Sequence, residues 1–281
     1  MPIPDPIAFT IFDIDVRWYG IILTAGMAAA GILGCRRAPA YGLTSDRILD
    51  FLLICIPSAI IGARLYYVIF NWSMYSGDLS QIINIRLGGL AIHGGLIAGL
   101  GAAVLLCYLW KIKPLSALDL AAPCLALGQA IGRWGNYFNS EAHGGPTDLP
   151  WAVTIGGETY HPTFLYESIW CLLLCLFLIY FDKRRNRDGH AKFEGQLICL
   201  YGILYSVERY FVEGLRTDSL MIGPFRQAQV ISLVIIAVCT VAYIIFYNKC
   251  SKIQKQCYNV FTSKSKEVTI CHLFLMKRKH T

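Results

Sequence analysis

The residues best suited to chemistry lie in one short stretch, Gly132–Gly144. It follows an apolar run that begins at Leu115, and it contains Arg133, Asn136 and Glu141. Such side chains do not belong in hydrocarbon, so at the end of a membrane span they indicate a site for a polar or anionic ligand. Arg133 and Asn136 are three residues apart, so a continuing helix places both on one face. Arg133 can then hold two oxygens of a phosphate, or it can form an internal ion pair with Glu141.

A second group of polar residues recurs at helical spacing inside a later apolar segment. Its members are Tyr205, Arg209, Glu213 and Arg216. At 100° per residue they stay within about 80° of arc, which predicts one polar stripe on an apolar helix. Arg209 and Glu213 can form a structural salt bridge, or the arginines and the tyrosine can bind an anionic headgroup.

Three further polar residues lie inside predicted spans or at their ends. His93, in a glycine-rich segment, is expected about two turns below the outer surface; its neutral imidazole suits a general base, although it can equally be a packing residue. Tyr19 lies at the end of the first apolar segment, where aromatic residues also occur as an interfacial belt. Pro162 fits the start of a helix, but Glu167 is unusual inside a span.

The composition indicates a membrane protein. Of the 281 residues, 56% are hydrophobic and 15% charged, with a mean hydropathy of +0.50, too apolar for a soluble globular domain. The eleven cysteines show no CxxC or metal-ligand spacing and predict neither disulfides nor zinc. The first sixteen residues contain no basic residue, so no cleaved signal peptide is expected. Hydrolase, zincin, P-loop and dinucleotide motifs are absent from the sequence, so we expect no metal and no cofactor.

The apolar segments predict an all-α polytopic membrane protein with about seven transmembrane helices and a small extracytoplasmic loop region, because about 20 apolar residues span a bilayer. The expected spans are Trp18–Cys35, Ile48–Phe70, Leu87–Trp110, Pro114–Gly132, Pro162–Phe181, Gln196–Val212 and Gln227–Tyr247. Between the fourth and fifth, Val153–Ile155 and Thr159–Tyr160 flank a Gly156-Gly157 turn and predict a short hairpin.

The basic residues predict the orientation. Eighteen of the 25 lysines and arginines, including every lysine, fall in the connections after alternate spans or in the C-terminal segment. Because such residues concentrate on the cytoplasmic side, the N-terminus should be extracytoplasmic and the C-terminus cytoplasmic. This asymmetry accounts for the net charge of +7 without a nucleic-acid partner. We expect one transmembrane catalytic domain, residues 1–248, followed by a basic cytoplasmic tail, 249–281, against the anionic inner leaflet.

These motifs together resemble the prolipoprotein diacylglyceryl transferase family of the bacterial inner membrane. Gly132–Glu141 with Gly144 is similar to the family pattern GRxGNFxNxExxG, with Tyr137 in place of phenylalanine. The WYG, AIHGGLIAG and HPTxLYE segments and the stripe that begins at Tyr205 match in the same order. The resemblance covers about residues 15–247.

The resemblance implies transfer of the diacylglyceryl group from phosphatidylglycerol to the lipobox cysteine of a preprolipoprotein, with membrane lipids as surroundings. It implies catalytic roles for His93, Arg133 and Arg209. The positions it implies for substrate binding are Tyr19, Asn136, Glu141, Gly144, Tyr205, Glu213 and Arg216. The alternatives are a non-catalytic binder or transporter of anionic phospholipid, and a phospholipase-like hydrolase that needs no thiol.

Overall fold

The computed structural model describes residues 1, 4–84, 88–187 and 193–277, with side chains described to residue 252. Eight α-helices, two short 3-10 helices and three two-stranded hairpins make up this part of the chain. The helices are α1 (Trp18–Arg37), η1 (Ala38–Tyr41), α2 (Ser45–Phe70), α3 (Trp72–Tyr75), η2 (Leu79–Ile82), α4 (Ile92–Leu109), α5 (Pro114–Phe138), α6 (Thr163–Arg187), α7 (Gln196–Leu215) and α8 (Gln227–Lys277). The strands are β1 (Ile7–Ile11), β2 (Ile14–Arg17), β3 (Val153–Ile155), β4 (Glu158–Tyr160), β5 (Met221–Ile222) and β6 (Phe225–Arg226).

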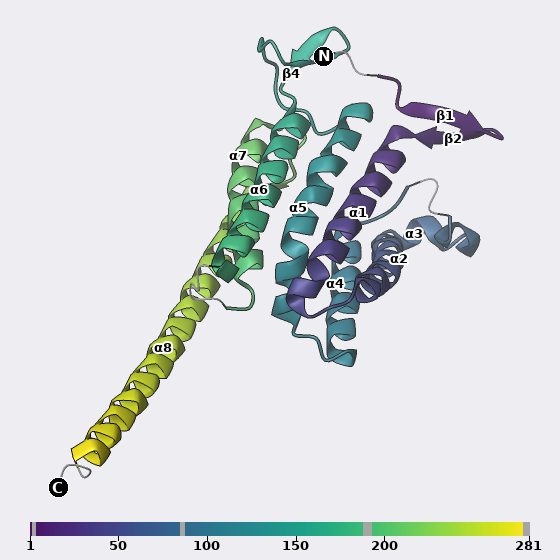
Figure 1. Cartoon of the computed structure of the whole chain (residues 1–281). Coiled ribbons are helices and arrows are strands. Elements are labelled where there is room, and N and C mark those ends of the chain that lie inside the picture. Colours follow the sequence, from purple (N-terminus) through teal and green to yellow (C-terminus); the bar gives the residue numbers. More distant parts are fainter. Residues whose placement is uncertain (2–3, 85–87, 188–192, 278–281) are drawn as a thin grey trace.

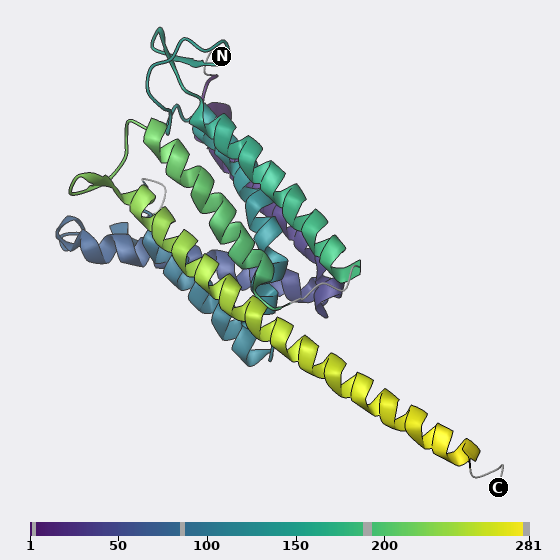
Figure 2. The same ribbon diagram turned by 90° about the vertical axis from the view of Figure 1, so that its left-hand side faces the viewer.

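Helix α5 is the centre of the bundle. It packs against α1, α6 and α7, while α2 pairs with α4 on one side and α8 packs on α7 on the other (Figures 1 and 2). The hairpins β1–β2 and β3–β4 lie at the end of the bundle where α5 finishes (Figure 1). We call this the signature end, because it holds Arg133–Gly144, and the opposite end, with Arg37, Arg47 and Lys111, the basic end.

Six of the described helices are long and apolar enough to cross a membrane: α1, α2, α4, α5, α6 and α8. Most of their large apolar side chains are exposed on the outside of the bundle, as expected for a protein in lipid. The predicted count of seven is not confirmed. Helix α7 is 20 residues long and lies within the bundle, but Glu208, Arg209 and Glu213 make it less apolar than the other six.

Helix α5 continues through the polar stretch instead of ending at Gly132. It runs on to Phe138, which confirms that Arg133 and Asn136 share one helix. Hydrogen bonds hold this last part of α5 to α6: the Trp134 indole donates to Ser168 Oγ at 3.0 Å, and Ser168 Oγ donates to the Ala130 carbonyl at 2.7 Å. The polar groups are therefore carried on a rigid, packed helix rather than on a loop.

The predicted hairpin in the long connection before α6 is confirmed. Val153 pairs with Tyr160 and Ile155 with Glu158, around the Gly156-Gly157 turn. The hairpins β1–β2 and β5–β6 were not predicted. Met1 extends the β3–β4 hairpin, since its carbonyl accepts a hydrogen bond from the Thr154 amide at 2.9 Å.

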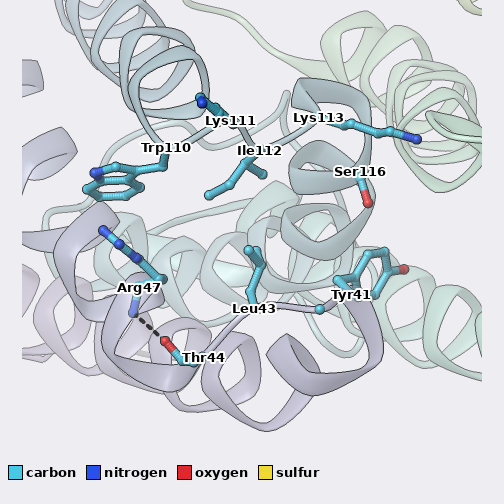
Figure 3. A pocket seen from close by; sticks show the side chains of 10 residues that line it. Tyr41, Leu43, Thr44, Arg47, Trp110, Lys111, Ile112, Lys113 and Ser116 are labelled. Atoms are coloured by element: carbon cyan, nitrogen blue, oxygen red, sulfur yellow. Dashed lines mark hydrogen bonds between the residues drawn. The ribbon is translucent and has the colours of Figure 1, made fainter.

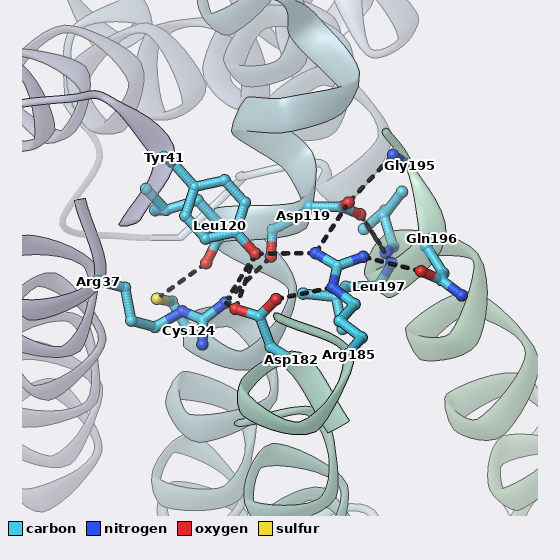
Figure 4. A network of polar contacts seen from close by, with 11 residues as sticks. Arg37, Tyr41, Asp119, Leu120, Cys124, Asp182, Arg185, Gly195, Gln196 and Leu197 are labelled. Atoms are coloured by element: carbon cyan, nitrogen blue, oxygen red, sulfur yellow. Dashed lines mark hydrogen bonds and ion pairs between the residues drawn. The ribbon is translucent and has the colours of Figure 1, made fainter. Parts of the chain in front are cut away.

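At the basic end, η1 and the turn between α4 and α5 come together around Leu43 and Ile112 (Figure 3). Beside them lies a buried network of charged side chains (Figure 4). Asp119 accepts hydrogen bonds from the amides of Gly195, Leu197 and Ile198 and so satisfies the start of α7.

The same network joins α1 to α6. Arg185 lies 2.8 Å from Asp182 and 3.6 Å from Asp119, and Asp182 also pairs with Arg37 at 3.2 Å (Figure 4). These ion pairs are almost fully buried, so they join α1, α5, α6 and α7 into one body at the end opposite the signature.

Helix α8 continues without a break past residue 248, the predicted end of the transmembrane domain, as far as Lys277 (Figure 2). Its apolar part that could cross a membrane is Gln227–Lys252. The assignment of 249–281 as a separate basic tail stays a prediction.

Candidate active site

The site is built around one buried carboxylate, Glu167 of α6. Its side chain is 1% exposed and pairs with Arg133 of α5 and, at 3.1 Å, with Arg209 of α7. Arg209 also pairs with Glu213 one turn further along α7, at 2.7 Å. Three helices thus bring together two arginines and two carboxylates that are far apart in the sequence.

The ion pairs leave both guanidinium groups partly accessible. The Arg133 and Arg209 side chains are 20% and 19% exposed, whereas those of Glu167 and Glu213 are 1% and 4% exposed. A guanidinium has five N–H donors, and the contacts of Arg133 and Arg209 with other described residues use only part of them. The carboxylates therefore hold the arginines in place while N–H groups stay available for an oxyanion.

Tyr205 completes the contacts of Arg133. Its hydroxyl accepts a hydrogen bond from Arg133 at 3.3 Å, and its ring stacks on that of Tyr201 with centroids 5.6 Å apart. The Tyr201 hydroxyl in turn donates to Gln129 at 2.8 Å. The structure therefore brings together Arg133, Tyr205, Arg209 and Glu213 of the predicted site residues.

A groove leads away from this cluster. Its volume is about 790 Å³, and it runs between α1, α2, α4 and α5. Its polar lining residues at the signature end are Tyr19, Gln129, Arg133 and Asn136, and nearly all the rest of the lining is apolar, toward Pro114 at the basic end. A polar end on a long apolar groove fits a molecule with an anionic head and hydrocarbon chains.

Asn136 and Glu141 interact with each other just beyond Arg133. The Asn136 amide donates to Glu141 at 3.0 Å, and Asn139 donates to the same oxygen at 3.4 Å. Glu141 therefore does not pair with Arg133, and the alternative of an Arg133–Glu141 ion pair is not observed. Glu141 is exposed and orients the Asn136 amide at the rim of the groove.

Tyr19 lies against the same helix. A Cβ atom on Gly135 would come within 2.7 Å of the Tyr19 ring, so only glycine allows this close contact. The ring thereby covers the last turn of α5 next to Asn136, at the mouth of the groove.

Gly144 and Arg216 lie together in a neighbouring connection. They form an isolated β-bridge, and a Cβ on Gly144 would lie 2.7 Å from that of His161 and 3.1 Å from the Leu215 carbonyl. Arg216 pairs with Asp218, with hydrogen bonds of 2.9 and 2.8 Å that hold the pKa of the Asp218 carboxyl below its usual value. These contacts favour a structural part for Gly144 and Arg216.

His93 lies apart from the arginine cluster. The expected span begins at Leu87, which is outside the described residues, but α4 begins at Ile92 after Gly88 and Gly89, whose φ values are +89° and +77°. His93 is therefore the second residue of its helix, not two turns along it. It is exposed, its ring lies 6.2 Å from that of Tyr66, and it does not line the groove.

Two residues at the site, Glu167 and Glu208, were not assigned to it from the sequence. Glu167 was noted as unusual in a span, and that charge inside an apolar run was the signal. Glu208 is buried with neither carboxylate oxygen hydrogen-bonded, and it lies within electrostatic reach of Glu167, Arg133 and Arg209. In the part of the chain that the structure describes, no three His, Cys, Asp or Glu residues are grouped so that they could hold a metal ion.

The fold and the site together define a class: a multi-pass membrane protein whose helices hold an arginine-rich cluster at the polar end of a lipid-sized groove. Comparison with known proteins identifies the family. The model of the prolipoprotein diacylglyceryl transferase family matches residues 6–245, and the chain belongs to this family of transferases.

Three relatives carry the name phosphatidylglycerol–prolipoprotein diacylglyceryl transferase. The protein of Finegoldia magna is 50% identical over 232 residues, covering 83% of this chain and 92% of its own length. That of Clostridioides difficile is 49% identical and that of Clostridium kluyveri 48%, each covering 82% of this chain and 90% and 92% of their own lengths. The predicted membership of this family is confirmed.

Proposed function

We propose that the chain transfers the diacylglyceryl group of phosphatidylglycerol to the lipobox cysteine of a preprolipoprotein. The cysteine sulfur attacks the glycerol carbon that carries the phosphate ester, the C–O bond breaks, and a C–S thioether forms. Glycerol phosphate leaves with the bonding electron pair, and the thiol proton passes to a base or to solvent. No oxidant, metal or cofactor is needed for this balance.

The observation that carries the proposal is the junction of the arginine cluster with the groove. Arg133 both pairs with Glu167 and lines the groove, so a lipid whose chains occupy the groove presents its phosphate to that guanidinium. Negative charge grows on the phosphate as the C–O bond breaks, and donors already in place stabilise it without reorganisation. Arg209, held to the same carboxylate, adds a second positive charge.

The neighbouring residues have supporting parts in this proposal. Glu167 and Glu213 fix the two guanidinium groups, and the Tyr205 hydroxyl orients Arg133. Asn136, oriented by Glu141, and Tyr19 form the rim where the headgroup and the thiol meet. Gly144 and Arg216 hold the connection that covers this end.

Activation of the thiol requires removal of its proton. A free cysteine has a pKa near 8.5, so at neutral pH most of it is protonated. We retain His93 as the proposed base, although it stands outside the groove lining. The positive field of two arginines is the alternative, since it favours the thiolate without any proton acceptor.

We place the enzyme in the bacterial inner membrane with the signature end outside. The basic residues of the opposite end support this orientation, which leaves the N-terminus extracytoplasmic and the C-terminus cytoplasmic. The signature end would then face preprolipoproteins on the outer side of that membrane.

One assay tests the reaction. Purified protein is incubated with phosphatidylglycerol and a lipobox peptide, or with the same peptide carrying serine in place of cysteine, and product masses are measured. We expect a thioether product and released glycerol phosphate with the cysteine peptide only. Release with both peptides indicates a hydrolase, and lipid binding without either product indicates a binder or transporter.

A further inference from the structure

A second cavity lies at the basic end, away from the arginine cluster. It has a volume of about 410 Å³ and is formed by the chain before and at the start of α2 and by the turn between α4 and α5 (Figure 3). Arg47, Lys111 and Lys113 line it, and no acidic residue does. The cavity therefore has a positive lining at the end of the bundle where it would meet a membrane surface.

Two of these three cations are available to a ligand. Lys113 points away from the cavity (Figure 3), and it pairs with Glu194 at 2.7 Å. The ion pair of Arg47 with Asp50 is long, at 3.9 Å, and exposed, of the kind that contributes little to stability. Lys111 has no ion pair with any described residue. Figure 3 shows Arg47 and Lys111 on either side of Trp110, at the same edge of the cavity.

Trp110 fixes this side of the cavity at a defined depth. The Arg47 guanidinium lies 4.5 Å from the centre of its ring, a cation–π contact that holds the arginine extended. Tryptophan at the end of a membrane helix lies at the level of the lipid headgroups. Arg47 is thus held at the depth where phosphates of one leaflet are found, and Lys111 follows Trp110 directly in the sequence at that end of α4.

The cavity also adjoins the apolar groove. Leu43 lines both, and the groove residues Ile48, Pro114 and Ala117 directly follow the cavity residues Arg47, Lys113 and Ser116 in the sequence. A ligand that fits both spaces has an anionic head and an apolar chain. A soluble phosphate ester would use the cations but would leave the groove unused.

We propose that this cavity binds the phosphate headgroup of an anionic phospholipid from the leaflet at the basic end, with an acyl chain in the adjoining part of the groove. Arg47 and Lys111 hold the phosphate, and Trp110 borders the headgroup. This site is separate from the Arg133–Glu167–Arg209 cluster and does not depend on transfer chemistry.

The test uses the full chain in phosphatidylcholine nanodiscs that contain increasing amounts of phosphatidylglycerol with a photoreactive headgroup. After illumination, we expect adducts on residues 41–47 and 110–116, with the yield saturating as the probe increases. The double variant Arg47→Gln/Lys111→Gln should need roughly ten- to thirtyfold more probe for half-saturation, because each cation near an anionic headgroup contributes about a fivefold factor or somewhat less.

The control removes two charges at the same end but outside the cavity, in Arg36→Gln/Lys183→Gln. Both residues are exposed, and this variant should saturate like the unchanged protein. If the double variant does not fold, Lys111→Gln alone, at an exposed position, should raise the probe concentration for half-saturation by a smaller factor. Turnover is not measured, so failure of the proposed reaction does not affect the result.

Three results would overturn the proposal. The first is the absence of adducts on the two segments, and the second is an equal loss in the cavity variant and its control. The third is that millimolar glycerol phosphate displaces the probe as effectively as unlabelled phosphatidylglycerol does. That result would mean that the site binds a soluble phosphate.

Discussion

Glu167 should contribute more to stability than any other carboxylate of the site, because two arginines depend on it. In Glu167→Gln, Arg133 keeps only the Tyr205 hydroxyl at 3.3 Å, whereas Arg209 keeps Glu213 at 2.7 Å. Breaking a buried ion pair by removing one partner costs about 3–5 kcal/mol. The two arginine side chains are about one-fifth exposed, so we expect a value near the lower limit, about 3 kcal/mol.

The comparison variants follow from the same contacts. Glu213→Gln leaves Arg209 paired with Glu167 at 3.1 Å, so it should cost about 1.5 kcal/mol, as for one hydrogen bond to a charged group. Asp148→Asn, at an exposed position of the connection before α6, should change stability by no more than about 0.5 kcal/mol. Adding Arg133→Gln to Glu167→Gln should restore part of the loss, since no unpaired guanidinium is left.

The measurement is unfolding of the purified protein in mixed micelles, with thioether formation recorded in parallel. Glu167→Gln should lower turnover strongly, because Arg133 no longer has a fixed direction toward the groove. Equal losses of stability in Glu167→Gln and Glu213→Gln would refute the idea of one shared carboxylate. So would a double variant that is no more stable than Glu167→Gln alone.

Four other predictions can be measured directly. If His93 accepts the thiol proton, His93→Gln should lower turnover by about 10²–10⁴-fold, with a smaller loss as pH approaches the thiol pKa; near-normal turnover at neutral pH would remove it from the chemistry. Arg133→Lys and Arg209→Lys should each reduce turnover strongly and lipid binding less, because lysine keeps the charge without the planar pair of donors; full activity of both variants would exclude phosphate binding by a guanidinium fork. The pKa of Asp218 is lowered in the folded protein, so its contribution to stability is present above the unfolded pKa and is lost as pH falls through the folded pKa. Asp218→Asn should therefore make the stability of the protein less dependent on pH at the acid end, measured by thermal unfolding between about pH 6 and pH 2. An unchanged pH dependence would exclude this contribution. In a cysteine-free background, a cysteine at position 148 should react with an external reagent in intact cells and one at 187 should not; the reverse pattern would invert the proposed orientation.

The parts of the fold that could be predicted were those set by long apolar runs and by a strong turn. Six spans and the β3–β4 hairpin follow from such patterns. The start of α4 could not be placed from the sequence. The apolar composition continues through Gly88 and Gly89, but both have a positive φ, which an α-helix does not allow. Hairpins β1–β2 and β5–β6 have only two to five residues per strand, too few for a clear alternation.

The arginines and the tyrosine of the site could be found from the sequence, but the carboxylate that Arg133 meets could not. Arg133 has Glu141 eight residues away, yet it pairs with Glu167 on another helix. Which carboxylate an arginine meets is decided by how α5, α6 and α7 pack, and periodicity within one helix contains no information about that. Arg209 and Glu213 lie on the same helix one turn apart, and this pair was predictable for that reason.

The pairing also explains why an arginine-rich site can exist within a membrane bundle. An isolated guanidinium there would be costly, and the cost falls when a buried carboxylate lies against it. Glu167 is shared between the two arginines, and Glu213 pairs with Arg209, so two carboxylates balance the two guanidiniums. Both carboxylates are buried, whereas the two arginine side chains stay 20% and 19% exposed. The cluster is therefore stable enough to be held on rigid helices, and it still presents N–H donors to a phosphate at its accessible side.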